Sequence, residues 1–136
     1  MVWTAEGQEP SSPQLVWQTG SNGALPDSID QIKNVKAGVD MDGDGKKEFM
    51  VPVRHLEDGV LRRSIFVFEN TGDDAYEAVW SYTFPGAADQ FVTLEVSDLD
   101  GDGNQEILAV HIPAGTDNAS VLFVFENKGD NDYGTE

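Results

Sequence analysis

The sequence has 136 residues, enough for one domain or two small repeated units, and 39% of them are hydrophobic, enough for a buried core. Its 25 acidic and 8 basic residues give a net charge of −17, which disfavours binding to nucleic acid or anionic membranes and favours binding of cations. It contains no cysteine, which excludes disulfides and thiolate metal sites, and no apolar run reaches the roughly 18–20 residues of a membrane span.

We expect a flexible segment followed by two similar β units. The stretch "EGQEPSSP" contains prolines and serines that are typical of an extended linker. The predicted parts are a flexible segment at 1–13, which contains a candidate exchanged strand, a first unit at 14–76 and a second unit at 77–136.

Four short strands are predicted in each unit, because β-branched and aromatic residues recur in short runs bounded by turn residues. A strand containing Val-Trp opens each unit. The predicted strands lie at about 14–18, 34–39, 48–54 and 63–69 in the first unit, and at about 77–84, 91–97, 106–112 and 120–126 in the second. Residues 28–38 have weak helical spacing, but their counterpart in the second unit is strand-like, so a loop followed by a strand is expected there. The strand at 63–69 is apolar on both faces and should be covered on both sides.

Three landmarks recur in the same order. "SIFVFEN" at 64–70 returns as "VLFVFEN" at 121–127, and "QLVW" at 14–17 is matched by "EAVW" at 77–80. The third landmark is an acidic run, "DMDGDGKKE" at 40–48, which returns as "DLDGDGNQE" at 98–106. Landmarks repeated at a nearly constant offset indicate an internal repeat.

The acidic runs fall between the second and third predicted strands of each unit. Three carboxylates at alternate positions of one turn repel each other unless they stay solvated, which is the alternative, or surround a cation. Calcium takes 6–8 oxygen ligands with flexible geometry, and the glycines allow a tight curl. An EF-hand loop would need its closing acid at position twelve, where this chain has Val51 and Ala109, whereas the acid here is at position nine. The loops therefore predict two strand–loop–strand calcium sites.

The loop and the apolar strand after it, as in "DMDGDGKKEFMVPV" and "DLDGDGNQEILAVH", resemble the calcium loops of FG-GAP and VCBS-type repeats. The resemblance covers residues 14–136 and implies blades like those of extracellular, integrin-like β-propellers. It implies side-chain ligands at loop positions one, three, five and nine, and a main-chain carbonyl at position seven. The implied ligands are Asp40, Asp42, Asp44, Lys46 and Glu48, and Asp98, Asp100, Asp102, Asn104 and Glu106.

Propellers typically have 4–8 blades, and two units cannot close a ring. The expected fold is therefore all-β, with two tandem four-stranded antiparallel blade-like units packed together rather than a closed propeller.

Other candidate sites are interpreted as structural. His55 and His111 have no accompanying nucleophile pattern, and every close pair of carboxylates is assigned to metal binding, so no enzymatic activity is expected. Asn118 begins an "NAS" glycosylation sequon in a polar loop and is a candidate N-glycan site. The aromatic residues could either pack in the core, which we favour, or form a platform for a sugar; they are Trp17, Trp80, Tyr76, Tyr82 and Tyr133.

We expect a non-enzymatic, calcium-stabilised module for structural assembly or adhesion, located outside the cell or on its surface. The alternatives are a carbohydrate-binding module and a two-blade part of a larger propeller. Expected partners are other copies of the chain, a glycan or a cell surface, without nucleic-acid binding or membrane insertion. Self-association is suggested because the second unit lacks a final Val-Trp strand, whereas the chain starts with a spare copy at Val2-Trp3. The spare strand could close the chain on itself, or it could fill the vacancy of the next molecule, and this head-to-tail exchange would give a ring or a filament.

Overall fold

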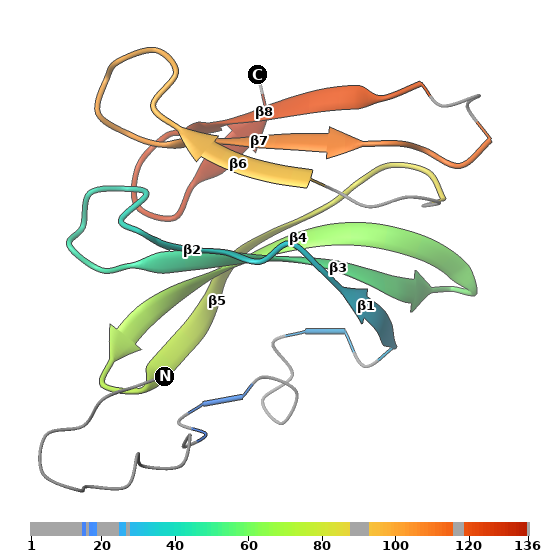
Figure 1. The fold of residues 1–136 in the computed structure, drawn as a ribbon, viewed down its shortest axis with the longest axis horizontal. Helices are drawn as coiled ribbons and strands as arrows, with labels where there is room; N and C mark the ends of the chain where they lie inside the picture. The colour runs from blue at the N-terminus through green and yellow to red at the C-terminus, as the bar shows by residue number, and fades with distance from the viewer. Residues whose placement is uncertain are drawn as a thin grey trace, which may run out of the picture.

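The computed structural model describes residues 15, 17–18, 25–26, 28–87, 93–115 and 119–135. These residues form two antiparallel sheets and no helix, and the sheets do not close into a barrel or propeller within the described part of the chain (Figure 1). The strands are β1 (Ile29–Ile32), β2 (Lys36–Val39), β3 (Glu48–Glu57), β4 (Val60–Gly72), β5 (Ala75–Thr83), β6 (Thr93–Ser97), β7 (Glu106–His111), β8 (Val121–Asn127) and β9 (Tyr133–Thr135). The expected all-β fold is confirmed.

The first sheet contains five strands in four positions. Its order is β1-β3-β4-β5, and β2 also pairs with β3. β2 pairs with the beginning of β3 and β1 with its end, because β3 is ten residues long and each partner has only four. The expectation of a loop followed by a strand at 28–38 is correct for β2 and wrong for β1. Asp30 on β1 forms an ion pair with Arg54 of β3, at 2.6 Å between Oδ2 and Nη2.

The second sheet has the order β6-β7-β8-β9 and lies over one face of the first sheet (Figure 1). The core between the sheets consists of Met41, Met50, Ile65, Val67, Phe84, Leu94, Ile107, Ala109, Phe125 and Tyr133. The opposite face of the first sheet carries a second cluster, in which Leu25 and Trp17 pack near Val53 and Phe68. Both faces of β4 are therefore covered, as expected from its sequence.

Two expectations about the Val-Trp strands are corrected. The strand at 77–84 exists as β5, but it pairs with β4 and belongs to the first sheet instead of opening the second. The reason is the tight turn at Asp74, whose positive φ of 54° folds β5 directly back onto β4. In the stretch 14–18, the described residues Leu15, Trp17 and Gln18 are not in a strand.

The strand position expected to be vacant in the second sheet is partly filled. β9 pairs with the end of β8, from Phe125 to Asn127. The proposed exchange segment at Val2-Trp3 lies outside the described residues, as does Asn118. Within the described part of the chain, no helix has the length and apolar character needed to cross a membrane.

Candidate metal centres

Each acidic loop joins two neighbouring strands of one sheet. The first runs from the end of β2 at Val39 to the start of β3 at Glu48, and the second occupies the same place between β6 and β7. In the first loop, Gly43 and Gly45 have φ values of 79° and 92°, which side chains rarely tolerate. The glycines allow the loop to curl around its own carboxylates.

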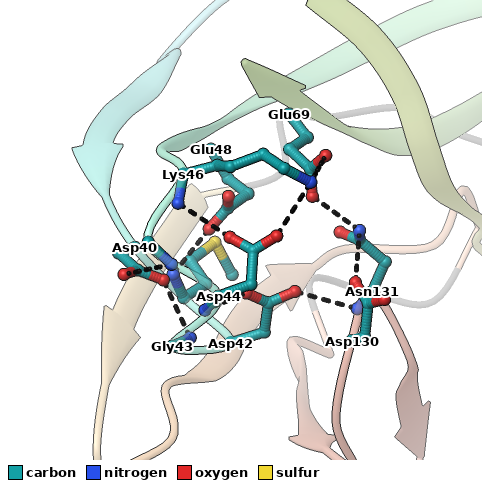
Figure 2. Close-up of polar contacts among 11 residues, drawn as sticks. Asp40, Asp42, Gly43, Asp44, Lys46, Glu48, Glu69, Asp130 and Asn131 are labelled. Carbon is teal, nitrogen blue, oxygen red and sulfur yellow. Dashed lines mark hydrogen bonds and ion pairs between the residues drawn. The ribbon is translucent and has the colours of Figure 1, made fainter. Parts of the chain in front are cut away.

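Backbone N–H groups orient the aspartates of the first loop (Figure 2). The carboxylate of Asp40 accepts hydrogen bonds from Gly43 N at 2.8 Å and from Gly45 N at 3.0 Å. Asp42 Oδ1 accepts from Asp44 N at 3.2 Å, and Asp44 Oδ1 accepts from Lys46 N at 2.7 Å. Each bond spans at most five residues, so the local sequence alone determines these orientations.

The second loop repeats this pattern. Asp98 accepts from the backbone of Gly101 at 2.7 Å and of Gly103 at 3.1 Å. Asp100 Oδ1 accepts from Asp102 N at 3.0 Å, and Asp102 Oδ1 accepts from the backbone N of the residue at position seven at 2.8 Å. The two loops therefore share one geometry as well as one sequence pattern.

The glutamate at position nine is the most informative group in each loop. Glu48 and Glu106 are each only 1% exposed. Glu48 Oε2 accepts a hydrogen bond from Met41 N at 2.5 Å, and Glu106 Oε2 accepts one from Leu99 N at 2.7 Å. The other oxygen of each carboxylate, Oε1, is buried without a hydrogen-bond partner in the described part of the chain. A buried carboxylate oxygen without a partner is costly. A bound cation would remove this cost, so the oxygens of each loop fit a cation site.

The structure brings three of the predicted ligands of each loop into one group. Carboxylate oxygens from Asp40, Asp42 and Glu48 lie within 4.8 Å of one another, as do those from Asp98, Asp100 and Glu106. The aspartates at position five lie in neighbouring groups instead; Asp44 clusters with Glu48 and Glu69, and Asp102 clusters with Asp100 and Glu126. The main-chain ligands predicted at Lys46 and Asn104 stay predictions.

The side chain of Lys46 lies beside the first group. Its Nζ is 2.9 Å from Asp44 Oδ2 and 2.6 Å from Glu69 Oε1. The hydrogen bond from Lys46 lowers the pKa of Asp44, whereas burial, followed by repulsion from Asp42, Asp40 and Asp44, raises the pKa of Glu48 to about 7. The first centre therefore holds more negative charge than its protein surroundings neutralise.

Three residues near the first centre were not predicted from the sequence. Glu69 lies directly opposite Glu48 in the β3–β4 register. Asn131 donates from its backbone N to Asp42 Oδ2 at 3.0 Å, and from its side chain to Glu69 Oε2 at 2.8 Å (Figure 2). Asp130 completes a carboxylate group with Asp42 and Glu69. Glu69 had a sequence signal, the repeated "FVFEN", whereas Asp130 and Asn131 had none.

The histidines are buried in packing positions. His55 Nε2 lies 2.8 Å from Ser64 Oγ, and both residues are almost inaccessible. His111 stacks on Phe84, with ring centroids 4.8 Å apart. These contacts support structural roles for both.

The aromatic residues also pack against one another. Trp17 makes edge contacts with Phe68 at 5.7 Å and with Tyr76 at 5.3 Å between ring centroids. Trp80 makes the matching contacts with Phe125 at 5.3 Å and with Tyr133 at 5.4 Å. These contacts favour packing over a free platform for a sugar.

Comparison with known protein families places the chain in a repeat family. A family model described as FG-GAP-like repeat matches residues 40–109, which is half of the chain and includes both acidic loops. The comparisons with curated proteins and with solved structures found no match. The chain therefore belongs to the family of FG-GAP-like repeat proteins.

Proposed function

We propose that this chain is a non-enzymatic, calcium-stabilised extracellular module that works through structural assembly or adhesion. The observation that supports it most is the pair of buried glutamate oxygens, one in each acidic loop, that have no hydrogen-bond partner in the described part of the chain. A hard cation with several oxygen ligands would satisfy both.

In the first loop, the residues that would hold calcium are Asp40, Asp42, Asp44 and Glu48, with the carbonyl of Lys46. The corresponding residues of the second loop are Asp98, Asp100, Asp102 and Glu106, with the carbonyl of Asn104. The ion would neutralise the repelling carboxylates and fix each loop between its two strands. Because the unfolded chain has no preformed site, the binding free energy adds to the stability of the fold.

The extracellular and non-enzymatic parts of the proposal rest on the family and on the roles of the clustered residues. FG-GAP repeats typically occur in extracellular proteins, and the family is generally non-enzymatic. The clustered acids are accounted for as metal ligands, and both histidines are buried. A repeat module of the β-propeller type acts through its surfaces, so assembly or adhesion is the function that this arrangement supports best.

Thermal unfolding of the metal-free protein tests the calcium proposal. Adding calcium at a hundred times its Kd should raise the free energy of unfolding by about 2.7 kcal/mol per site, and a chelator should abolish the increase. Magnesium serves as the matched control, since it retains its water shell more strongly and should stabilise less. A melting temperature that is equal in calcium and in chelator would contradict the proposal.

A further inference from the structure

Buried apolar side chains hold the two sheets together. The first sheet and its loop contribute four side chains, Met41, Met50, Ile65 and Val67, which are at most 1% exposed beneath the second sheet. Fully burying one such side chain stabilises by roughly 1.5–3 kcal/mol, so these four side chains contribute strongly to the contact between the sheets.

The repeat gives the second sheet the same four apolar positions. The residues that correspond are Leu99, Leu108, Leu122 and Val124. Leu99 is 54% exposed and Leu122 is 59% exposed, in contrast to the buried Met41 and Ile65. In the described part of the chain, nothing covers this outer face as the second sheet covers the first.

The surroundings of Met41 show which residues the buried face of the first sheet contacts in the second sheet. Met41 O accepts hydrogen bonds from Asn127 Nδ2 at 2.6 Å and from Gln105 N at 3.1 Å. Its side chain belongs to the cluster that contains Ile107 and Tyr133. The second sheet and the loop that precedes β7 thus provide a seat of four residues for the residue at loop position two.

Among the described residues, the first sheet has a hollow at the counterpart of this seat. A hollow of about 320 Å³ is lined by residues that include Lys47, Phe49, Asn70 and Tyr76. These four correspond in the repeat to Gln105, Ile107, Asn127 and Tyr133. In the chain itself, Asn70 Nδ2 donates a hydrogen bond within its own turn, to Gly72 O at 2.9 Å. On docking, this amide would rotate and donate to the docked residue instead, as Asn127 Nδ2 does to Met41 O.

We propose that the outer face of the second sheet binds the first sheet of a second copy of this chain, with Leu99 of one copy seated in the hollow at Asn70 and Tyr76 of the other. This inference rests on the proposed function and identifies the partner in assembly as a second copy of the chain. The sheets are stacked (Figure 1), and Phe49, which lines the hollow, belongs to the cluster on the face of the first sheet that points away from the second sheet. The two surfaces therefore lie on opposite sides of the stacked sheets, so the contact is head-to-tail and builds a ring or a filament.

The charges at this contact make it depend on a divalent cation. In the chain, the turn of the second sheet places Asn131 on Asp42 and Glu69. The corresponding residue of the first sheet's turn is Asp74, which has nearly the same φ, 54° against 53°. Docking would therefore place an acid beside the group formed by Asp100, Asp102 and Glu126.

The second loop also has no lysine at position seven. Lys46 neutralises Asp44 and Glu69 in the first loop, whereas Asn104 only donates a hydrogen bond to Asp102, at 3.0 Å. The partnerless Glu106 Oε1 gives the cation a ligand there. The contact between copies should therefore form in calcium and dissociate in chelator.

Single cysteines test the geometry, because the chain has none of its own. Leu99→Cys and Asn70→Cys are made in separate molecules, mixed in calcium and oxidised. We expect a covalent dimer of the two variants, formed much more efficiently than in a mixture of Leu56→Cys with Asn70→Cys. Leu56 is a matched control because it is 50% exposed but lies at the far end of β3. Equal yields from both mixtures would overturn the proposal.

Sedimentation across a range of concentrations tests association of the unmodified chain. We expect calcium-dependent growth in mass, weakened at least about tenfold by Leu122→Glu and unchanged by Leu56→Glu. Calcium titration of the same samples separates the two proposals. A chain that binds calcium but stays monomeric at every concentration overturns the head-to-tail contact alone, whereas a chain that binds no calcium overturns the proposed function as well.

Discussion

Replacing Glu48 by glutamine should change stability in opposite directions with and without calcium. Burial raises the pKa of Glu48 from 4.5 to about 7, which means that the folded state without metal resists its ionisation. At about 1.4 kcal/mol per pKa unit, keeping this group ionised at pH 7 costs the metal-free fold roughly 3 kcal/mol. Glutamine has no charge to bury and can still accept the hydrogen bond from Met41.

In chelator, Glu48→Gln should therefore stabilise the fold by up to about 3 kcal/mol, or on the order of 6–10 °C in melting temperature for a chain of this size. In calcium the variant should lose most of the ion's stabilisation at the first site, since it lacks the closing carboxylate. The assay is thermal unfolding followed by circular dichroism in both conditions.

Glu57→Gln is the matched control, because it removes the same charge from an exposed residue that lies 3.4 Å from Arg62. Its effect should be small and similar in both conditions. The reasoning would be refuted if Glu48→Gln were destabilising in chelator as well as in calcium, or if both variants behaved alike.

Four further outcomes are expected. The stability of the metal-free protein, measured as the difference between wild type and Glu48→Gln, should fall as the pH rises from about 4.5 to about 7. The raised pKa of Glu48 contributes stability that is fully present below the pKa of the unfolded chain and is lost above the pKa of the folded chain. A difference that does not change with pH would argue against a buried, ionising Glu48. Asp42→Asn and Asp100→Asn should each abolish one bound calcium ion in native mass spectrometry, and loss of both ions from either variant would show that the sites are not separate. Asn131→Ala should lower the stability by about 1–3 kcal/mol in urea unfolding, because it leaves Glu69 without its amide donor, whereas Asn131→Ala and wild type of equal stability would mean that this contact contributes nothing. Phe68→Ala should cost about 3–5 kcal/mol, since its ring is fully buried between Phe49 and Trp17, and a cost below 1 kcal/mol would contradict the observed packing.

The acidic loops could be predicted from the sequence because all of their internal contacts are local. Asp40 is oriented by two backbone groups within five residues, and Glu48 closes the loop from the next strand. By contrast, Asn131 reaches Asp42 across 89 positions of the chain, and only the stacking of the two sheets brings them together. Contacts between residues of different sheets cannot be recognised in a local sequence pattern.

The grouping of strands was harder to predict than their existence. A repeat fixes the period of a unit but not its starting point, so the Val-Trp strand could either open one unit or close the previous one. The two-residue turn at Asp73 and Asp74 decides this, because it pairs β5 with β4 at once. β1 was missed because its partner is the far end of β3, which extends three residues past the predicted end at residue 54.

The number of calcium ions bound per folded chain tests the central proposal most directly. Calorimetric titration of metal-free protein should give two ions for the wild type, one for Glu48→Gln or Glu106→Gln alone, and none for the double variant. Binding of no calcium by the wild type, or undiminished binding by the double variant, would contradict the two-site proposal.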